Sequence, residues 1–90
     1  MPYSVRIDPH VQKEMAPIPA KDRASILAII KSLAQDPRPA GCIPIKGPEK
    51  YMYRVRVGDY RVIYGLQDEE QKVIVARVTR RREDTYRGLS

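Results

Sequence analysis

The sequence predicts an α+β fold in which a small antiparallel sheet carries two helices on one face. Three observations favour this class. An alternating run opens the chain, apolar residues then recur at helical spacing up to residue 35, and three strand-like runs follow at residues 51–57, 60–66 and 72–80. The expected order is β-α-α-β-β-β within a single domain that spans residues 1–90.

The N-terminal half predicts one strand and two helices. Residues 4–8 alternate apolar and polar side chains as a half-buried strand does, and Pro9 ends the run. Residues 10–16 fit a short helix that the prolines at 17 and 19 close. Residues 21–35 form a longer amphipathic helix, and the face that we expect to pack on the sheet consists of Ile26, Leu27, Ile30, Leu33 and Ala34.

A hairpin is predicted around Gly58-Asp59, because a two-residue turn with Gly first suits a type II′ geometry. Counting outward from this turn pairs Val57 with Tyr60 and Arg56 with Arg61. Side chains alternate between faces along a strand. The apolar members therefore share the face under the helices, namely Tyr53, Val55, Val57, Tyr60, Val62, Tyr64 and Leu66.

The last strand extends this pattern if its five-residue connection pairs Leu66 with Lys72. Arg77 then lies opposite Arg61. The same count assigns Ile74, Ala76 and Val78 to the core, and places Thr79 and Arg81 on the side of the arginines.

The charge of the chain is concentrated in its C-terminal half. Seventeen Lys and Arg against eleven Asp and Glu give a net charge of +6 over 90 residues. Residues 46–61 and 77–87 each carry a net charge of +3, and the rest of the chain sums to zero. Such clustering indicates an anion-binding site rather than a uniformly solubilised surface.

Several other classes of protein are disfavoured. The single cysteine, Cys42, excludes an internal disulfide framework and a cysteine cage for a metal, and it fits a reducing cytosol. No residues with metal-ligand spacing are present, and His10 is interpreted as structural. The chain has no signal peptide and no apolar run near the roughly 20 residues of a membrane span, so we expect a cytoplasmic protein without a membrane partner.

The predicted register places several arginines on the open face of the sheet. Like charges that face one another across a sheet destabilise it, so an anionic partner is the favoured explanation for this row: Arg54, Arg56, Arg61, Arg77 and Arg81. Nucleic acid fits best, because guanidinium binds phosphate through two hydrogen bonds and stacks on bases. A solvated charged face is the alternative interpretation.

The hairpin sequence YRVRVGDYRVIY at residues 53–64, the strand after it and the C-terminal Tyr86-Arg87 resemble the RelE/ParE superfamily of toxins from toxin–antitoxin systems. The resemblance covers nearly the whole chain and is stronger to the RelE branch. It implies two helices on a small antiparallel sheet. It also implies an mRNA endoribonuclease that acts in the ribosomal A site without a metal or other cofactor.

That chemistry, as the resemblance implies it, uses a 2′-hydroxyl as nucleophile and leaves a 2′,3′-cyclic phosphate. It needs a proton acceptor, cations for the phosphorane and a proton donor for the leaving oxygen. The residues that match the family's catalytic positions are Arg54, Arg56, Arg61, Arg81 and Tyr86, and further RNA contacts are expected from Lys46, Arg77, Arg80 and Arg82.

The proton acceptor is left open by the sequence. Arg54 and Arg56 stand where the best-studied RelE pattern has lysines, and guanidinium is a poor base. Lys46 and Tyr86 are the alternatives, and Arg80 or Arg82 can take the place of Arg81.

Expected partners are the ribosome, mRNA and a RelB-like antitoxin, whose complex with the toxin can bind operator DNA. Two alternative functions follow from the same resemblance. One is a ParE-like toxin that poisons DNA gyrase, and the other is an inactive relative that only binds its antitoxin.

Overall fold

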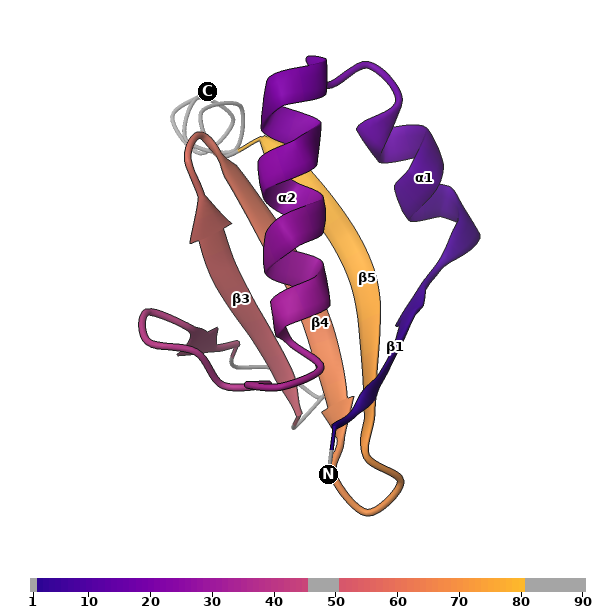
Figure 1. Ribbon diagram of the computed structural model, residues 1–90, viewed down its shortest axis with the longest axis vertical. Helices are drawn as coiled ribbons and strands as arrows, with labels where there is room; N and C mark the ends of the chain where they lie inside the picture. The colour runs from indigo at the N-terminus through magenta and orange to yellow at the C-terminus, as the bar shows by residue number, and fades with distance from the viewer. Residues whose placement is uncertain (1, 46–50, 81–90) are drawn as a thin grey trace.

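The computed structural model describes residues 2–45 and 51–80, which form two helices on one face of a five-stranded sheet (Figure 1). In chain order the elements are β1 (Ser4–Ile7), α1 (Pro9–Met15), α2 (Ala20–Ser32), β2 (Ile43–Pro44), β3 (Met52–Val57), β4 (Tyr60–Gln67) and β5 (Lys72–Arg80). The spatial order of the strands is β1-β5-β4-β3-β2. The predicted α+β class is confirmed.

The sheet is mixed, which corrects the expectation of a wholly antiparallel one. β1 runs parallel to β5, with Ser4 opposite Lys72 and Ile7 opposite Val75. All other neighbouring strands are antiparallel. Alternation along a strand is the same for either direction, so the pattern of residues 4–8 does not reveal the direction of its partner.

Both helices begin beside prolines. Pro9 occupies the first turn of α1, where its fixed φ suits a helix and its missing N–H has no intrahelical partner to lose. Pro19 precedes α2 in an extended conformation. The second helix ends at Ser32, three residues before the predicted boundary at 35, because the amides of Ala34 and Gln35 bond the carbonyls of Lys31 and Ser32 in a tighter turn.

The core lies between the two helices and the inner face of the sheet. α1 contributes Val11 and Met15, and α2 contributes Ile26 and Ile30, followed by Leu33 just beyond its end. Leu27, which was expected on the buried face, is 37% exposed. From the sheet, the fully or nearly fully buried residues are Val55, Tyr60, Val62, Tyr64, Leu66, Val73, Val75 and Val78.

The short strand β2 has no counterpart in the sequence-based expectation. Ile43 pairs with Arg54, and Pro44 pairs with Tyr53. A proline is tolerated here because β2 is the edge strand and needs no second ladder of hydrogen bonds. Its two residues are too few to show an alternating pattern.

Candidate nucleic-acid interface

The predicted hairpin register is confirmed residue by residue. Val57 lies opposite Tyr60, Arg56 opposite Arg61 and Arg54 opposite Ile63. Gly58 has φ +60°, and Asp59 does not have a positive φ, as a type II′ turn requires. Tyr60, Val62 and the residues that alternate with them on the helix side are buried, so Arg54, Arg56 and Arg61 share the opposite, outer face of the sheet.

The predicted register between β4 and β5 is wrong by one residue at the connecting turn. Leu66 pairs with Val73 instead of Lys72, so Val73 and Val75 enter the core in place of Ile74 and Ala76. A shift of one residue moves every side chain to the other face. The connection is therefore one residue shorter than the count assumed, with Gln67 already paired to Lys72.

A bulge at Ala76 reverses this shift further along β5. Tyr64 pairs with Val75 and Ile63 pairs with Arg77, so one residue of β5 is left over between them. Beyond the bulge the predicted faces hold again, and Val78 is buried as expected. Arg61 lies opposite Thr79, and Arg77 lies opposite Ile63, which corrects the expected pairing of Arg77 with Arg61.

Two side chains of α1 hold the bulged segment of β5. His10 Nε2 lies 2.6 Å from the carbonyl oxygen of Ala76, and this acceptor requires the proton on that nitrogen. Glu14 accepts hydrogen bonds from Arg77 Nε at 3.2 Å and from the backbone N–H of Val78 at 2.9 Å. His10 is thus structural, as interpreted. Glu14, which sequence reasoning missed, neutralises part of the charge of Arg77.

The described arginines of the outer face differ in exposure. Arg56 is exposed, and Arg54 and Arg61 are half-buried. Arg77 and Arg80 are exposed on β5, but Arg80 lies opposite the buried Tyr60 and therefore on the helix side of the sheet, away from the other arginines. The other predicted site residues, Lys46, Arg81, Arg82 and Tyr86, lie outside the described residues.

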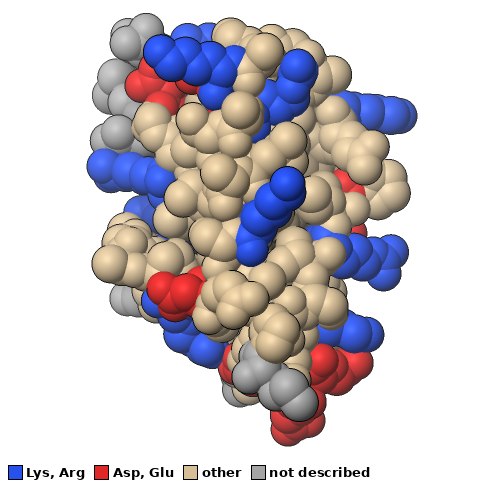
Figure 2. Space-filling model, in the orientation of Figure 1, with Lys and Arg blue, Asp and Glu red and all other residues tan. Residues whose placement is uncertain are grey.

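The sign of the charge distinguishes the two faces of the molecule. On the helix-covered face, Figure 2 shows Lys and Arg interspersed with Asp and Glu. In contrast, none of the residues in the five described strands is Asp or Glu. The outer face of the sheet therefore presents cations without carboxylates in its ladder, which is an arrangement suited to a polyanion.

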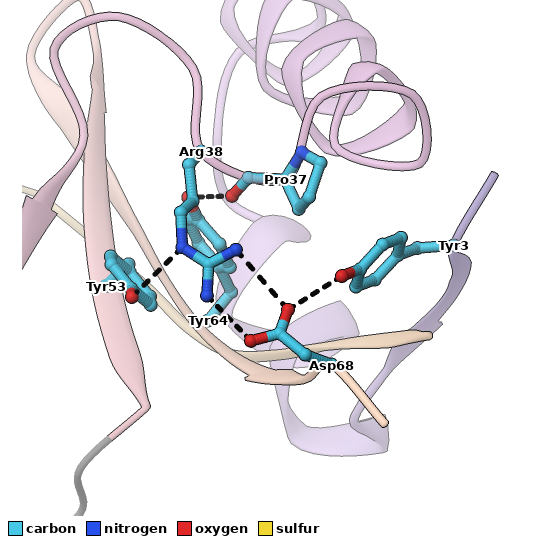
Figure 3. A network of polar contacts seen from close by, with 6 residues as sticks. All are labelled: Tyr3, Pro37, Arg38, Tyr53, Tyr64 and Asp68. Carbon is cyan, nitrogen blue, oxygen red and sulfur yellow. Dashed lines mark hydrogen bonds and ion pairs between the residues drawn. The ribbon is translucent and has the colours of Figure 1, made fainter. Parts of the chain in front are cut away.

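A polar network lies at the end of the sheet away from the β3–β4 turn, beside the β4–β5 connection (Figure 3). Arg38 donates two hydrogen bonds to the carboxylate of Asp68, at 2.7 and 3.3 Å, and its Nε donates to the Tyr53 hydroxyl at 3.2 Å. Tyr3 donates to the same carboxylate at 2.7 Å. These bonds tie the loop after α2 and the N-terminal segment to the β4–β5 connection.

The network also sets the ionisation of its members. The hydrogen bonds from Arg38 lower the pKa of Asp68 below its usual value, and the hydrogen bond to Asp68 raises the pKa of Tyr3. Burial raises the pKa of Tyr64, whose hydroxyl donates to the carbonyl of Pro37 at 2.8 Å. None of these groups is therefore poised as a proton acceptor near neutral pH.

A hollow of about 540 Å³ near the end of β5 is less suited to phosphate. It lies between the α1–α2 connection and the β3–β4 turn, and its lining mixes Arg77 and Arg80 with the carboxylates of Glu14, Asp22 and Asp59. Carboxylates repel an anionic ligand. The outer face of the sheet is therefore the better candidate for an anion site.

Residues 2–45 and 51–80 contain neither a metal-binding cluster nor a membrane-spanning helix. No group of three or more His, Cys, Asp or Glu is placed to hold a metal ion. Neither helix has the length and apolar character to cross a membrane.

The fold and the charge together define a class, namely a small α+β protein with an open, arginine-bearing sheet face. A family model described as the ParE toxin of type II toxin–antitoxin systems matches residues 5–85. The chain therefore belongs to the RelE/ParE superfamily of type II toxin–antitoxin toxins.

Similar proteins carry RelE-type names. The putative toxin RelE1 of Methanocaldococcus jannaschii is 29% identical over 91 residues and covers 98% of this chain and 99% of its own. The toxin RelG of Mycobacterium tuberculosis is 28% identical over 88 residues, with coverages of 97% and 99%. The archaeal RelE–RelB complex from Pyrococcus horikoshii contains a chain that is 28% identical, with a TM-score of 0.80 over 90% of this chain and 97% of that one.

Proposed function

We propose that this toxin-family protein is a ribosome-dependent mRNA endoribonuclease that inhibits translation without a metal. The observation that carries the proposal is the set of arginines on the outer face of strands that, as described, carry no Asp or Glu: Arg54, Arg56 and Arg61 lie close together through the hairpin register. Guanidinium groups neutralise phosphate oxygens and stabilise charge that develops on them. The RelE names of the similar proteins agree with this activity.

In the proposed reaction, the 2′-hydroxyl of one nucleotide attacks the adjacent phosphorus. The bond from phosphorus to the 5′-oxygen then breaks, which leaves a 2′,3′-cyclic phosphate and a 5′-hydroxyl. Arg61 and Arg81 stabilise the phosphorane, and Arg54 and Arg56 bind the same phosphate region. Tyr86 stacks on a base or transfers a proton.

The proton acceptor of this reaction is assigned to Lys46 or Tyr86, since a guanidinium group stays protonated in proteins and is a poor base. Further contacts to the RNA backbone are assigned to Lys46, Arg77, Arg80 and Arg82. The salt bridge of Arg77 to Glu14, at 3.2 Å, leaves Arg77 58% exposed and able to contact a phosphate from its other side.

A RelB-like antitoxin is the proposed partner that neutralises the toxin. The Pyrococcus horikoshii relative was solved with its RelB, which supports this assignment. We further propose that the toxin–antitoxin complex binds operator DNA and that the toxin acts in the cytoplasm.

The decisive experiment adds the purified protein to a coupled translation reaction and maps the 5′-ends of the message. Cuts within codons are expected with the wild type. Arg61→Ala should reduce the cutting rate by at least tenfold, whereas Lys21→Ala, which removes an exposed cation from α2, should leave the rate unchanged. Intact message and full protein yield with the wild type would contradict the proposal.

A second candidate function is poisoning of DNA gyrase, which is favoured by the ParE description of the matching family model. A supercoiling assay with gyrase separates the two. Inhibition of supercoiling together with intact mRNA would favour the gyrase poison. If the protein neither cuts mRNA nor inhibits gyrase, but binds its antitoxin tightly, it is an inactive relative.

A further inference from the structure

A second feature of the outer sheet face lies next to the arginines. It is a hollow of about 240 Å³ at the end of the sheet where β3 begins, β4 ends and β5 begins. One row of the sheet crosses it, because Met52 pairs with Gly65 and Gly65 pairs with Ile74. Tyr51, which is 61% exposed, and Ala76 also line it.

The hollow exists because of two small residues at positions where strands usually carry larger ones. Gly65 lies inside β4, where glycine weakens a strand and marks a close approach of another group. A Cβ atom at Gly65 would lie 3.1 Å from Met52 Sδ, so any side chain there would begin to fill the space. The bulge brings Ala76 to the same rim.

The chemistry of the lining suits one flat apolar group. A tyrosine ring, a thioether and aliphatic carbons surround the hollow, with Gln67 as its one polar lining residue among those described, and the apolar side chains stack well on aromatic faces. Its volume is below the range of about 300–1,000 Å³ that pockets for whole drug-sized ligands occupy. A single ring system fits it better than a complete small molecule.

Cations flank the hollow on two sides. Arg54 follows Met52 by two residues on the same face of β3, a separation of about 7 Å along the strand. On the far side, Arg6 of β1 pairs with Ile74. A ligand seated here therefore has an apolar ring in the hollow and negative charge next to it, which describes a nucleotide within a single strand.

We propose that the hollow between Met52, Gly65 and Ile74 receives one unstacked base of the bound RNA, while the adjacent phosphate contacts Arg54. This inference rests on the proposed function and adds to it a subsite that reads a base. The base lies beside the arginines, next to the cleaved phosphate, and the hollow holds it by stacking.

The test uses ribosomes programmed with messages in which one nucleotide at a time, at and around the A-site codon, lacks its base. With the wild type, one abasic position should slow cleavage by roughly 5- to 150-fold, the factor that loss of one base–aromatic stack of about 1–3 kcal/mol predicts. Gly65→Val should slow cleavage of the intact message to the rate of that abasic message. The abasic message should be cut equally fast by both proteins.

Tyr51→Ala gives an independent check, because this exposed ring can be removed without opening the core. It should reduce the penalty of the same abasic position. Lys21→Ala is the control that should change neither rate. Circular dichroism and melting curves establish that each variant is folded.

The outcomes separate the inference from the function on which it rests. If the wild type fails to cut any programmed message, the proposed function fails and the inference with it. If the wild type cuts, but loss of a base slows cleavage by Gly65→Val as much as it slows cleavage by the wild type at every position, the base subsite is refuted. The proposed nuclease activity is then still supported. Loss of antitoxin binding in Gly65→Val with unchanged cleavage would assign the hollow to the protein partner instead, and would also refute the inference.

Discussion

Glu14 of α1 accepts a hydrogen bond from the backbone N–H of Val78 in β5, across 64 residues of sequence and a distance of 2.9 Å. β1 pairs with β5 only up to Val75, so this amide lies on a stretch of edge that none of the described strands covers. A carboxylate on the neighbouring helix takes the place of the missing strand. The same carboxylate pairs with Arg77 at 3.2 Å, so one arginine of the sheet is held by α1.

Replacement of Glu14 tests this connection. Glu14→Ala should lower the free energy of unfolding by about 1–3 kcal/mol, because it leaves the part-buried amide of Val78 without its acceptor. Glu14→Gln keeps an oxygen acceptor, so its free energy of unfolding should fall by less. Chemical denaturation measures both variants, and equal losses would show that the charge of Glu14 matters more than its bond to the backbone.

The bond between Arg38 and Asp68 predicts a pH-dependent contribution to stability. The pKa of Asp68 is lower in the folded protein than its usual 3.8, so the carboxylate stabilises the fold above that value. The contribution is lost as the pH falls through the lower, folded pKa. Asp68→Asn should therefore melt below the wild type at pH 7, and the two melting temperatures should converge in strong acid. A difference between the two melting temperatures that does not change with pH would contradict this linkage.

The pairing of Arg56 with Arg61 predicts a conflict between stability and function. Like charges directly opposite on a sheet destabilise it by about 0.2–1 kcal/mol. Arg56→Gln should therefore raise the melting temperature slightly at low salt, while it slows cleavage of the message. Lys21→Gln is the matched control on α2, and it should leave cleavage unchanged. A lower melting temperature for Arg56→Gln would show that the two guanidinium groups do not repel each other in the fold.

The hairpin of β3 and β4 could be predicted because its information is local. A Gly-Asp turn determines which residues face each other, and strict alternation determines which face is buried. Counting residues outward from the turn was therefore enough to place Arg54, Arg56 and Arg61 on the outer face. The apolar face of α2 was predicted for the same reason, since Ile26, Ile30 and Leu33 follow the helical period.

The course of β5 could not be predicted in the same way. Its register depends on the length of the connection after Gln67 and on the bulge at Ala76, and a change of one residue in either reverses the faces. The run from 72 to 80 consists largely of residues that either face accepts. Only packing against α1, through His10 and Glu14, shows where the extra residue lies.

By itself, the sequence determined the class of fold, the hairpin that carries three of the site arginines and the family to which the chain belongs. The tertiary structure alone decided the parallel pairing of β1, the partners of Arg77 and Asp68, and the hollow at Gly65. The physical reason is sequence separation: turns and periodic faces are set by neighbours a few residues apart. The bonds of Arg38 with Asp68 and of His10 with Ala76 join residues 30 and 66 positions apart, and the hollow joins residues of three strands. Such contacts leave no period in the sequence.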